Sequence, residues 1–337
     1  MKALICHSPG HLEVVDRPAP GPAPKGYAAV DIKHIGICGT DYHIFEGKHP
    51  FLEYPRVMGH ELSGMVAEAA DGSGLKTGSP VIINPYIACG TCIACRKGKM
   101  NCCTNIRVLG VHTDGGMCER ILVPEENLYS AEGLSLRDAA MVEFLAIGAH
   151  AVRRSLAEAG SSALVIGTGP IGLGVAIFAR IAGLEVTLHD MSQERVSFAS
   201  ERLGFEKGVV LSDSAHEELM GLTGNDGFDV VFDATGNAAS IHKGFGLVAH
   251  GGAFVLVSVV KDNITFSDPE FHKREMMLIG SRNAQRADFE HVISSIRDGL
   301  VPLDELASHS TTLDQAPEAM ARWTHEKDGL IKAIITV

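Results

Sequence analysis

The chain reads Ala163-Leu-Val-Ile-Gly-Thr-Gly-Pro-Ile-Gly172 and, after a helical run that ends near Ala182, Glu185-Val-Thr-Leu-His-Asp190. The first four residues predict a buried strand, and the glycines then open a helix. A lone G-x-G-x-x-G motif is weak evidence for any function. Here it lies between a strand and a helix, and an acidic residue ends the next strand, which is the context of a dinucleotide-binding site.

Each part of this motif has a physical role toward a dinucleotide. The glycines let the backbone approach the pyrophosphate, which rests on the N-terminus of the helix. Asp190 would accept hydrogen bonds from the adenosine ribose hydroxyls and repel a 2′-phosphate, which favours NAD over NADP. Arg195 lies too far past the strand end to be assigned to a phosphate, and we keep it only as a residue of the cofactor site. The predicted cofactor-binding residues are Gly167, Gly169, Pro170, Ile171, Gly172, Asp190 and Arg195.

Strands and helices continue to alternate as far as residue 280. Four further apolar segments predict strands, and six strands with helical crossovers make a complete doubly wound parallel sheet, a Rossmann-type α/β domain. The tail then adds an amphipathic helix at 288–298, a second helix from Leu313 and a strand at 331–337. These elements have no place in a six-stranded sheet, so we expect the tail to pack on the N-terminal domain. The four strand segments are 208–211, 228–233, 252–258 and 276–280.

The first 85 or so residues are rich in β patterns. Segments 28–33 and 62–68 partly alternate apolar and polar residues, and Val81-Ile-Ile83 is a short apolar run. Proline and glycine cluster between these segments. Short strands with frequent turns predict a compact, partly closed β domain.

Within this domain, the stretch from Gly36 to Glu61 supplies the ligand types that zinc takes in catalytic sites. Cys38, His60 and Glu61 offer a thiolate, an imidazole and a carboxylate, and three protein ligands leave one position of the metal open. Thr40 and His43 add a hydroxyl and a second imidazole, so an alcohol polarised by a metal would have a path for its proton. On these residues alone, the ordinary alternative is a buried cysteine unrelated to the histidine.

A second cluster lies in a cysteine-rich segment. Eight cysteines in a chain without a secretory signal favour metal binding or catalysis over disulfides. Four thiolates can enclose one tetrahedral ion and fill every position, which predicts a structural zinc site. The alternatives are an iron–sulfur cluster and free thiols. The candidate ligands are Cys89, Cys92, Cys95 and either Cys102 or Cys103.

The composition limits the class of partner. At 337 residues the chain exceeds one typical domain, and its formal charge of −12 argues against nucleic acid and anionic membranes as partners. The uncharged run 161–179 is interrupted by glycines and a proline, so it is better explained as strand, turn and helix than as a membrane span. The N-terminus has no signal-type apolar core, and we therefore expect a cytoplasmic protein.

Together these motifs resemble those of the zinc-dependent medium-chain alcohol dehydrogenases over essentially the whole chain. The matching motifs are Gly36-Ile-Cys-Gly-Thr-Asp41, Gly59-His-Glu61, the four-cysteine lobe, Asp114-Gly-Gly116 and the glycine fingerprint. Within the family, the chain is most similar to the polyol and sugar-acid branch, which includes sorbitol, idonate and galactonate dehydrogenases. Glu143 falls where that branch has a Glu-Pro pair near the metal, although Phe144 replaces the proline here.

The resemblance implies the architecture and the metals. It implies a GroES-like, partly closed β-barrel catalytic domain formed by residues 1–144 and 280–337, and an NAD-binding Rossmann domain at 145–279. It implies two zinc ions per chain, one catalytic and one structural. The catalytic ion would be held by Cys38, His60 and Glu61 or Glu143, and the structural ion by Cys89, Cys92, Cys95 and Cys103 rather than Cys102.

The resemblance also implies the chemistry. Thr40 and His43 would relay the proton, and NAD would take a hydride from a secondary alcohol of a sugar acid or polyol. Arg282 and Asn283 are candidate substrate contacts, with Arg282 pairing with a carboxylate. The family further implies a homodimer or homotetramer that pairs the edge strands of the Rossmann sheet.

Two alternatives stay open from the sequence. One is a dehydrogenase of another alcohol, such as sorbitol, L-threonine or butanediol, because such enzymes share the same ligand motifs. The other is a non-catalytic dinucleotide-binding relative, although such relatives usually lose metal ligands and this chain has both sets.

Overall fold

The computed structural model describes residues 1–49, 52–69, 74–326 and 328–337, and its contacts divide the chain into two compact units. The first unit holds Met1–Glu143, Ile293–Gly299 and Leu306–Val337, and the second holds Phe144–Val292 and Leu300–Glu305. The sequence-based boundary after residue 144 lies within one residue of this division. The chain was expected to leave the second unit at residue 280, whereas these contacts place its return to the first unit at Ile293.

The first unit is built mainly from antiparallel strands in a three-stranded, a seven-stranded and a two-stranded sheet. Its helices are short: α1 (Gly39–Phe45), α2 (Ile93–Arg96), α3 (Leu136–Ala139), α12 (Ala316–Trp323), η1 (Met100–Cys102) and η2 (Glu125–Asn127). Its strands are β1 (Lys2–Ser8), β2 (His11–Asp16), β3 (Tyr27–Ile37), β4 (Arg56–Val57), β5 (Glu61–Ala69), β6 (Pro80–Ile83), β7 (Tyr86–Ile87), β8 (Arg107–Val108), β9 (Arg120–Pro124), β10 (Leu128–Ser130), β17 (Ala307–Thr312) and β18 (Lys332–Thr336).

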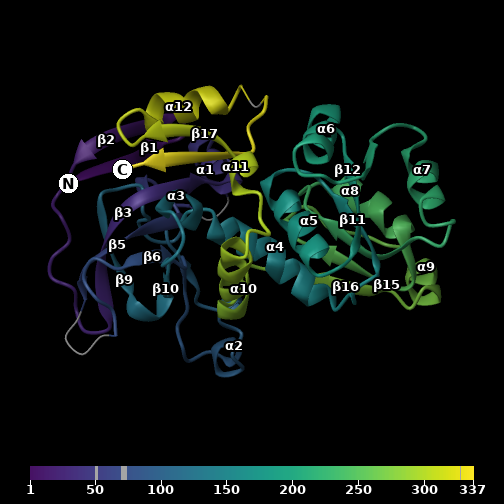
Figure 1. Cartoon of the computed structure of the whole chain (residues 1–337), viewed down its shortest axis with the longest axis horizontal. Helices are drawn as coiled ribbons and strands as arrows, with labels where there is room; N and C mark the ends of the chain where they lie inside the picture. The colour runs from purple at the N-terminus through teal and green to yellow at the C-terminus, as the bar shows by residue number, and fades with distance from the viewer. Residues whose placement is uncertain (50–51, 70–73, 327) are drawn as a thin grey trace. The chain divides into compact units, whose positions relative to one another are not determined.

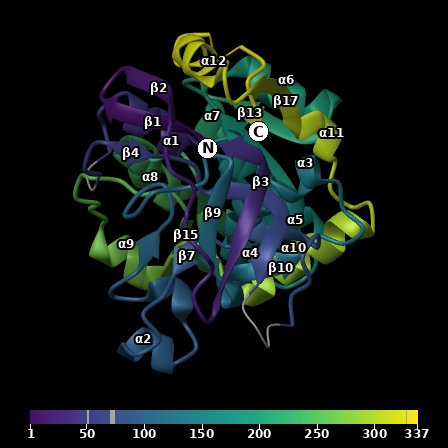
Figure 2. The ribbon, with the colours of Figure 1, turned by 90° about the vertical axis from the view of Figure 1, so that its left-hand side faces the viewer.

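Strand β3 organises the first unit. It pairs with β5, β9 and β18, all in the antiparallel sense, and Figure 2 shows β3 and β9 side by side. Val30 and Ile32 of β3 share one apolar core with Leu62 of β5 and Ile335 of β18. The C-terminal strand is therefore part of the same sheet as the N-terminal strands, as the yellow and purple segments in Figure 1 show.

The second unit contains a six-stranded parallel sheet, as the sequence predicted. The order is β13-β12-β11-β14-β15-β16. The chain therefore adds β12 and β13 on one side of β11, and then adds β14, β15 and β16 on the other side. The strands are β11 (Ser162–Ile166), β12 (Glu185–Asp190), β13 (Lys207–Val210), β14 (Phe228–Asp233), β15 (Val248–Leu256) and β16 (Met277–Gly280). This reversal is the switch point at which α/β sheets bind ligands.

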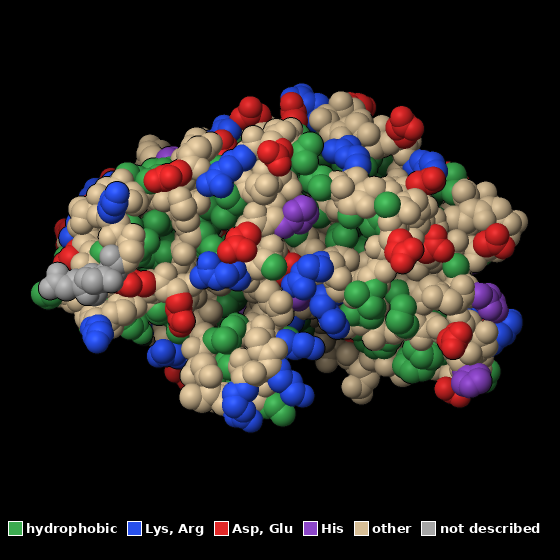
Figure 3. Space-filling view, turned by 60° about the horizontal axis from the view of Figure 1, so that its bottom comes forward, with side chains coloured by type: hydrophobic (Ala, Val, Ile, Leu, Met, Phe, Trp, Pro, Cys, Tyr) green, Lys and Arg blue, Asp and Glu red, His purple; other side chains and the backbone are tan. Residues whose placement is uncertain are grey.

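Helices precede, separate and follow these strands in the chain. They are α4 (Val142–Ser155), which begins at the boundary between the units, α5 (Pro170–Ile181), α6 (Gln193–Glu201), α7 (Ala215–Gly221), α8 (Ala238–Gly244), η3 (Phe245–Leu247), α9 (Asp268–Lys273), α10 (Arg286–Arg297) and α11 (Leu303–Leu306). In the part of the chain that the structure describes, no helix is long and apolar enough to cross a membrane. On the face drawn in Figure 3, charged side chains of both signs are interspersed with hydrophobic ones.

The expectation for the tail holds for β17 and β18 but not for the first part of α10. Residues 286–292 belong to the second unit. The physical reason is the buried Asp288 carboxylate, which bonds to His150 Nδ1 at 2.8 Å and to Arg153 Nε at 2.7 Å on α4. The sequence pattern showed an amphipathic helix here but not its partner.

Candidate active site and metal centres

Three predicted metal ligands converge in the first unit. Cys38 precedes α1, and His60 and Glu61 stand at the start of β5. The sulfur of Cys38, a ring nitrogen of His60 and a carboxylate oxygen of Glu61 all lie within 4.8 Å of one another. Gly36 of β3 pairs directly with Glu61, and a side chain at Gly36 would collide with the glutamate. Glycine is therefore required at this position if Glu61 is to reach the cluster.

Glu61 has a partner from the opposite end of the chain. Lys332 Nζ on β18 donates to Glu61 Oε1 at 2.7 Å and to Oε2 at 2.8 Å, and to the carbonyl oxygen of Ile37 at 3.2 Å. The two charged side chains are 1% and 0% exposed. Both oxygens of Glu61 are thus already hydrogen-bonded within the protein.

Glu143, at the start of α4, differs from Glu61 in this respect. Its Oε1 accepts a hydrogen bond from the hydroxyl of Tyr86. Its Oε2 is buried and has no hydrogen-bond partner among the described residues. Burial raises the pKa of Glu143 to about 7, although His60 opposes this increase. Such an orphaned buried oxygen is the kind of atom that a metal ion would satisfy.

Asp41 lies next to two of the candidate ligands, Cys38 and His60. One carboxylate oxygen accepts from the backbone N–H of Cys38 at 2.9 Å, and the other lies 3.8 Å from His60 Nδ1. Burial lowers the pKa of His60, but Asp41 and Cys38 outweigh this effect and raise it well above its usual value. The cluster therefore attracts positive charge. Its thiol, imidazole and carboxylate groups are ligand types that zinc accepts. A zinc ion would supply the positive charge that a proton on His60 supplies otherwise.

The predicted proton-relay residues lie on one face of α1. Thr40 is half-buried and His43 is exposed, and they are three residues apart in the same helix. Residues at this spacing are neighbours on a helix surface. Thr40 follows Cys38 by two residues in the sequence, and His43 is open to solvent.

The four-cysteine lobe also assembles as a group. The sulfurs of Cys89, Cys92, Cys95 and Cys103 all lie within 4.8 Å of one another, and Cys102 is exposed and lies outside the group. Backbone N–H groups of Cys89 and Asn105 donate to the sulfur of Cys103 at 3.2 and 3.4 Å. Four sulfurs with N–H donors fit a closed tetrahedral zinc site.

The glycine motif forms a tight turn in the second unit. Gly167 has φ of +91°, and a side chain there would press on Thr235 and Ala234 after β14. Gly169 precedes α5, Pro170 and Ile171 open that helix, and a side chain on Gly172 would collide with Gly167. The turn therefore exposes backbone at the N-terminus of α5, where a pyrophosphate can approach.

Asp190 ends β12 as predicted, but much of its hydrogen-bonding capacity is used within the protein. One oxygen accepts from the N–H and hydroxyl of Thr168 at 2.6 and 2.8 Å, and the other accepts from Ser192 N at 2.9 Å. Arg195 Nη1 lies 3.9 Å from Asp190 Oδ2. Arg195 is therefore closer to the strand end than its sequence position suggested, because α6 turns back beside the glycine loop.

Comparisons with known proteins identify the family. An alcohol dehydrogenase GroES-like domain matches residues 24–133, and a zinc-binding dehydrogenase domain matches residues 170–298. L-galactonate-5-dehydrogenase of Escherichia coli (strain K12) is 40% identical over 337 residues, which cover 100% of this chain and 99% of that protein. The chain belongs to the zinc-dependent medium-chain alcohol dehydrogenases.

Other members of this dehydrogenase family match over similar lengths. Sorbitol dehydrogenase of Halalkalibacterium halodurans is 30% identical over 327 residues, which cover 95% of each chain. The crystal structure of the alcohol dehydrogenase rspB from Escherichia coli CFT073, complexed with NADH, aligns with a TM-score of 0.93 at 28% identity over 100% of this chain and 99% of that one. These matches place the dehydrogenase in the polyol and sugar-acid branch and give it the GroES-like and Rossmann architecture predicted from the sequence.

The two predicted substrate residues of this dehydrogenase lie in the second unit. Arg282 is exposed and Asn283 is half-buried, directly after β16. Asn283 has φ of +51°, a conformation that asparagine tolerates better than most residues.

Sequence reasoning missed three residues of the dehydrogenase that complete these sites. Lys332 had a usable signal, because it is a lone charge inside the apolar strand Ile331-Lys-Ala-Ile-Ile335 and such a charge implies a buried partner. Tyr86 and Thr168 carried no such signal. Their roles depend on contacts that only the folded chain creates.

Proposed function

We propose that this dehydrogenase oxidises a secondary hydroxyl of a six-carbon sugar acid of the L-galactonate type, with NAD as the hydride acceptor. The observation that carries the proposal is the group of Cys38, His60 and Glu61, together with the buried, orphaned oxygen of Glu143 as a further candidate ligand. The substrate class is supported by the relative at 40% identity, which is an L-galactonate-5-dehydrogenase.

We assign the catalytic zinc to Cys38, His60 and Glu143. Distance favours Glu61 as the carboxylate ligand, because one of its oxygens lies in the three-residue group. Hydrogen bonding favours Glu143, because its Oε2 has no partner among the described residues. We give more weight to the hydrogen bonding, because Lys332 already donates to both oxygens of Glu61, whereas no described residue donates to Glu143 Oε2. Glu61 then adds negative charge beside the ion without binding it directly. The structural zinc is assigned to Cys89, Cys92, Cys95 and Cys103.

The proton leaves through α1 in this proposal. A zinc ion would supply the positive charge that lowers the pKa of the alcohol hydroxyl, and NAD would supply the hydride acceptor. Thr40 Oγ1, half-buried two residues after Cys38, accepts the hydroxyl proton and gives up its own. His43, exposed on the same helix face, passes that proton to water. The alcohol carbon loses two electrons and becomes a carbonyl, and one proton is released to solvent.

We propose that the second unit binds NAD through the glycine turn and Asp190. The NADH complex of rspB supports a nicotinamide dinucleotide as the cofactor. Asp190 Oδ1 accepts only from Ser192 N and keeps a lone pair for a ribose hydroxyl, whereas Oδ2 already accepts two hydrogen bonds from Thr168. Its negative charge disfavours a 2′-phosphate. Arg195, 3.9 Å from this carboxylate, offsets part of that charge.

Arg282 and Asn283 are proposed as substrate contacts. A guanidinium pairs with a carboxylate through two parallel hydrogen bonds, and a sugar acid carries such a carboxylate whereas sorbitol does not. The sorbitol dehydrogenase relative keeps the neutral polyol as the second candidate substrate.

The test is NADH formation with L-galactonate, L-idonate, sorbitol, xylitol, L-threonine and butanediol, each with NAD and with NADP. A preference for the hexonates supports the sugar-acid proposal if Arg282→Ala abolishes this preference by raising the KM for the hexonates. Equal rates with neutral polyols would refute the role of Arg282. A protein that holds two zinc ions and oxidises none of these alcohols would refute the substrate class.

We also propose a cytoplasmic homo-oligomer that pairs Rossmann edge strands. Strand β16 is an edge of the six-stranded sheet and exposes Met277 and Leu278 at 44% and 38%. An apolar edge strand favours pairing with a second copy. Leu278→Lys should lower the mass measured by light scattering, and an unchanged mass would contradict this assembly.

A further inference from the structure

Tyr86 is a buried residue of the first unit that the proposed reaction does not use. It opens β7, and its hydroxyl donates a hydrogen bond to Glu143 Oε1. Glu143 is only 2% exposed, and its other oxygen, Oε2, has no hydrogen-bond partner among the described residues. The two oxygens of this buried carboxylate therefore differ, because a phenol engages one of them and the other is left for a ligand.

Hydrogen bonds hold the backbone of Tyr86 on both sides. Asn84 Oδ1 accepts from the N–H of Tyr86 at 3.0 Å, and Asn127 Nδ2 donates to the carbonyl oxygen of Tyr86 at 3.1 Å. Asn127 is itself buried and also donates to the carbonyl oxygen of Asn84 at 2.8 Å. Such supporting bonds fix the orientation of the groups around a metal ligand.

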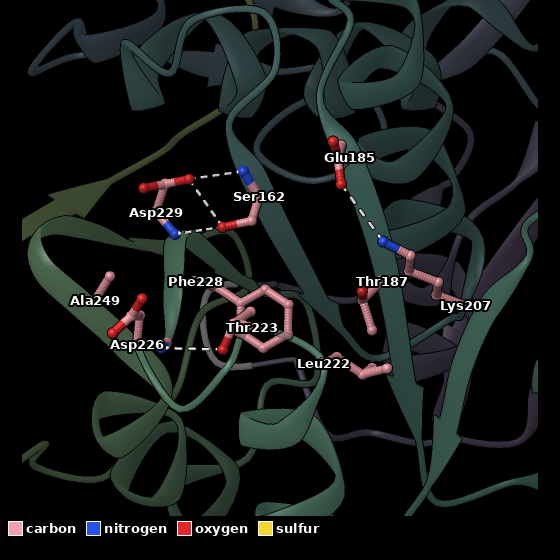
Figure 4. Close-up of a pocket in the computed structure, with 11 residues that line it drawn as sticks. Ser162, Glu185, Thr187, Lys207, Leu222, Thr223, Asp226, Phe228, Asp229 and Ala249 are labelled. Carbon is pink, nitrogen blue, oxygen red and sulfur yellow. Dashed lines mark hydrogen bonds and ion pairs between the residues drawn. The ribbon is translucent and has the colours of Figure 1, made fainter.

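Polar groups around a hollow of the second unit provide a contrast. The hollow has a volume of about 330 Å³ and lies where β11, β12, β13 and β14 begin (Figure 4). Ser162 Oγ donates there to Asp229 Oδ2 at 2.8 Å, and Lys207 Nζ lies 3.4 Å from Glu185 Oε2, as the dashed lines in Figure 4 show. These groups pair with one another, whereas Glu143 Oε2 has no donor among the described residues. The orphaned oxygen is therefore the stronger evidence for a ligand.

The state of Glu143 Oε1 matters because a carboxylate can bind a metal ion through one oxygen or through both. A catalytic zinc ion has three protein ligands and one open position for water or substrate. Cys38 and His60 each offer one ligand atom. If Glu143 offered both of its oxygens, the second oxygen would compete with the alcohol for the open position.

We propose that Tyr86 is a positioning residue of the catalytic site that limits Glu143 to one metal-binding oxygen. The phenol donates to Oε1 and makes that oxygen the poorer ligand, so Oε2 alone is offered to the ion. The fourth position then stays free for the substrate hydroxyl. This inference rests on the proposed catalytic zinc and on Glu143 as its third ligand, but it does not depend on which alcohol is oxidised.

The test replaces zinc by cobalt(II) in the full-length protein and titrates it with imidazole, a small neutral ligand that occupies an open metal position. Cobalt(II) absorbs visible light, and its spectrum changes when a ligand is added. The dissociation constant of imidazole can therefore be measured without substrate or NAD. The cysteine lobe offers four thiolates and no open position, so it should not respond to imidazole.

Tyr86→Phe keeps the ring and removes the hydroxyl. It should raise the Kd of imidazole about tenfold, because Oε1 then loses its hydrogen bond and competes for the open position. Tyr129→Phe is the matched control, since Tyr129 is 6% exposed against 7% for Tyr86 and its hydroxyl accepts from Asn84 Nδ2 at 3.3 Å. The control should leave the Kd unchanged, and urea unfolding of both variants separates a change in Kd from a loss of fold.

A second pair of variants shows whether Tyr86 acts through Glu143. Glu143→Gln replaces one carboxylate oxygen by an amide nitrogen, which is a poor metal ligand, so the side chain offers a single oxygen whether or not the phenol is present. Adding Tyr86→Phe to Glu143→Gln should therefore leave the Kd of imidazole at the value of Glu143→Gln alone.

An unchanged Kd in Tyr86→Phe, or an equal increase in Tyr129→Phe, would overturn the inference. An effect of Tyr86→Phe that persists beside Glu143→Gln would also overturn it, because the effect would not pass through Glu143. If Glu143→Gln alone left the cobalt spectrum unchanged, the ligand assignment would be wrong, and the role of Tyr86 would fail with it. Absence of activity with the hexonates would instead refute only the substrate class, because the titration uses neither substrate nor NAD.

Discussion

Replacing Lys332 by methionine tests the buried ion pair that supports the candidate active site. Methionine retains most of the apolar stem and removes the charge, so the change isolates the ammonium group. Lys332 Nζ makes hydrogen bonds of 2.7 and 2.8 Å to Glu61, and both side chains are essentially unexposed. Removing one partner of a buried pair leaves the other charge uncompensated, and this costs about 3–5 kcal/mol.

The assay is urea unfolding of wild type, Lys332→Met, Glu61→Gln and the double variant, with and without zinc. The double variant should be more stable than Lys332→Met, because no carboxylate is then left without a partner. The destabilisation by Lys332→Met should be larger in zinc-free protein, since a nearby divalent ion compensates part of the Glu61 charge. Lys2→Met is the matched control, because the Lys2–Asp314 pair is about half exposed and screened by water.

This reasoning would be wrong if Lys332→Met unfolded at the same urea concentration as Lys2→Met. It would also be wrong if the double variant were less stable than Lys332→Met, because the Glu61 charge would then not be the source of the loss.

Three further predictions test the metal lobe, the buried carboxylate of the second unit and the proton path. Cys103→Ser should lower the zinc content by one ion per chain while Cys102→Ser leaves it unchanged, as measured by elemental analysis. Burial raises the pKa of Asp288, but His150 and Arg153 outweigh it and hold the value at about 2, so this carboxylate stabilises the fold above pH 4 and loses that effect as the pH falls toward 2. Asp288→Asn should therefore cost about 2 kcal/mol at neutral pH in urea unfolding. Asp298→Asn, which removes an exposed carboxylate after α10, is the control, and an equal loss in the two variants would contradict the prediction. Thr40→Val should lower kcat about 100-fold with zinc content unchanged, and Thr40→Ser should restore it; an unchanged kcat would exclude the relay.

The parts of the structure that sequence predicted are those with short-range signals. The six parallel strands follow from apolar runs and the glycine turn, and the cysteine lobe follows from ligand spacing. The match is close at β14, where the expected and observed bounds are both 228–233. Such features depend on residues within one or two elements of each other.

The parts that sequence did not predict depend on long-range contacts. Lys332 and Glu61 are separated by 271 positions and meet only because β18 pairs with β3. The bond from Tyr86 to Glu143 decides which glutamate oxygen is left free, and it crosses 57 positions. The place of α10 was misjudged for the same reason, because its amphipathic pattern shows that a face is buried but not that His150 is its partner.

We propose that Cys38 belongs to a catalytic zinc site separate from the cysteine lobe. The most direct measurement is the zinc content per chain of wild type and Cys38→Ser, made on the same samples whose NAD reduction is recorded. We predict two ions in wild type and one in Cys38→Ser, with oxidation of the alcohol abolished. Two ions in Cys38→Ser, or full activity with one, would contradict the account.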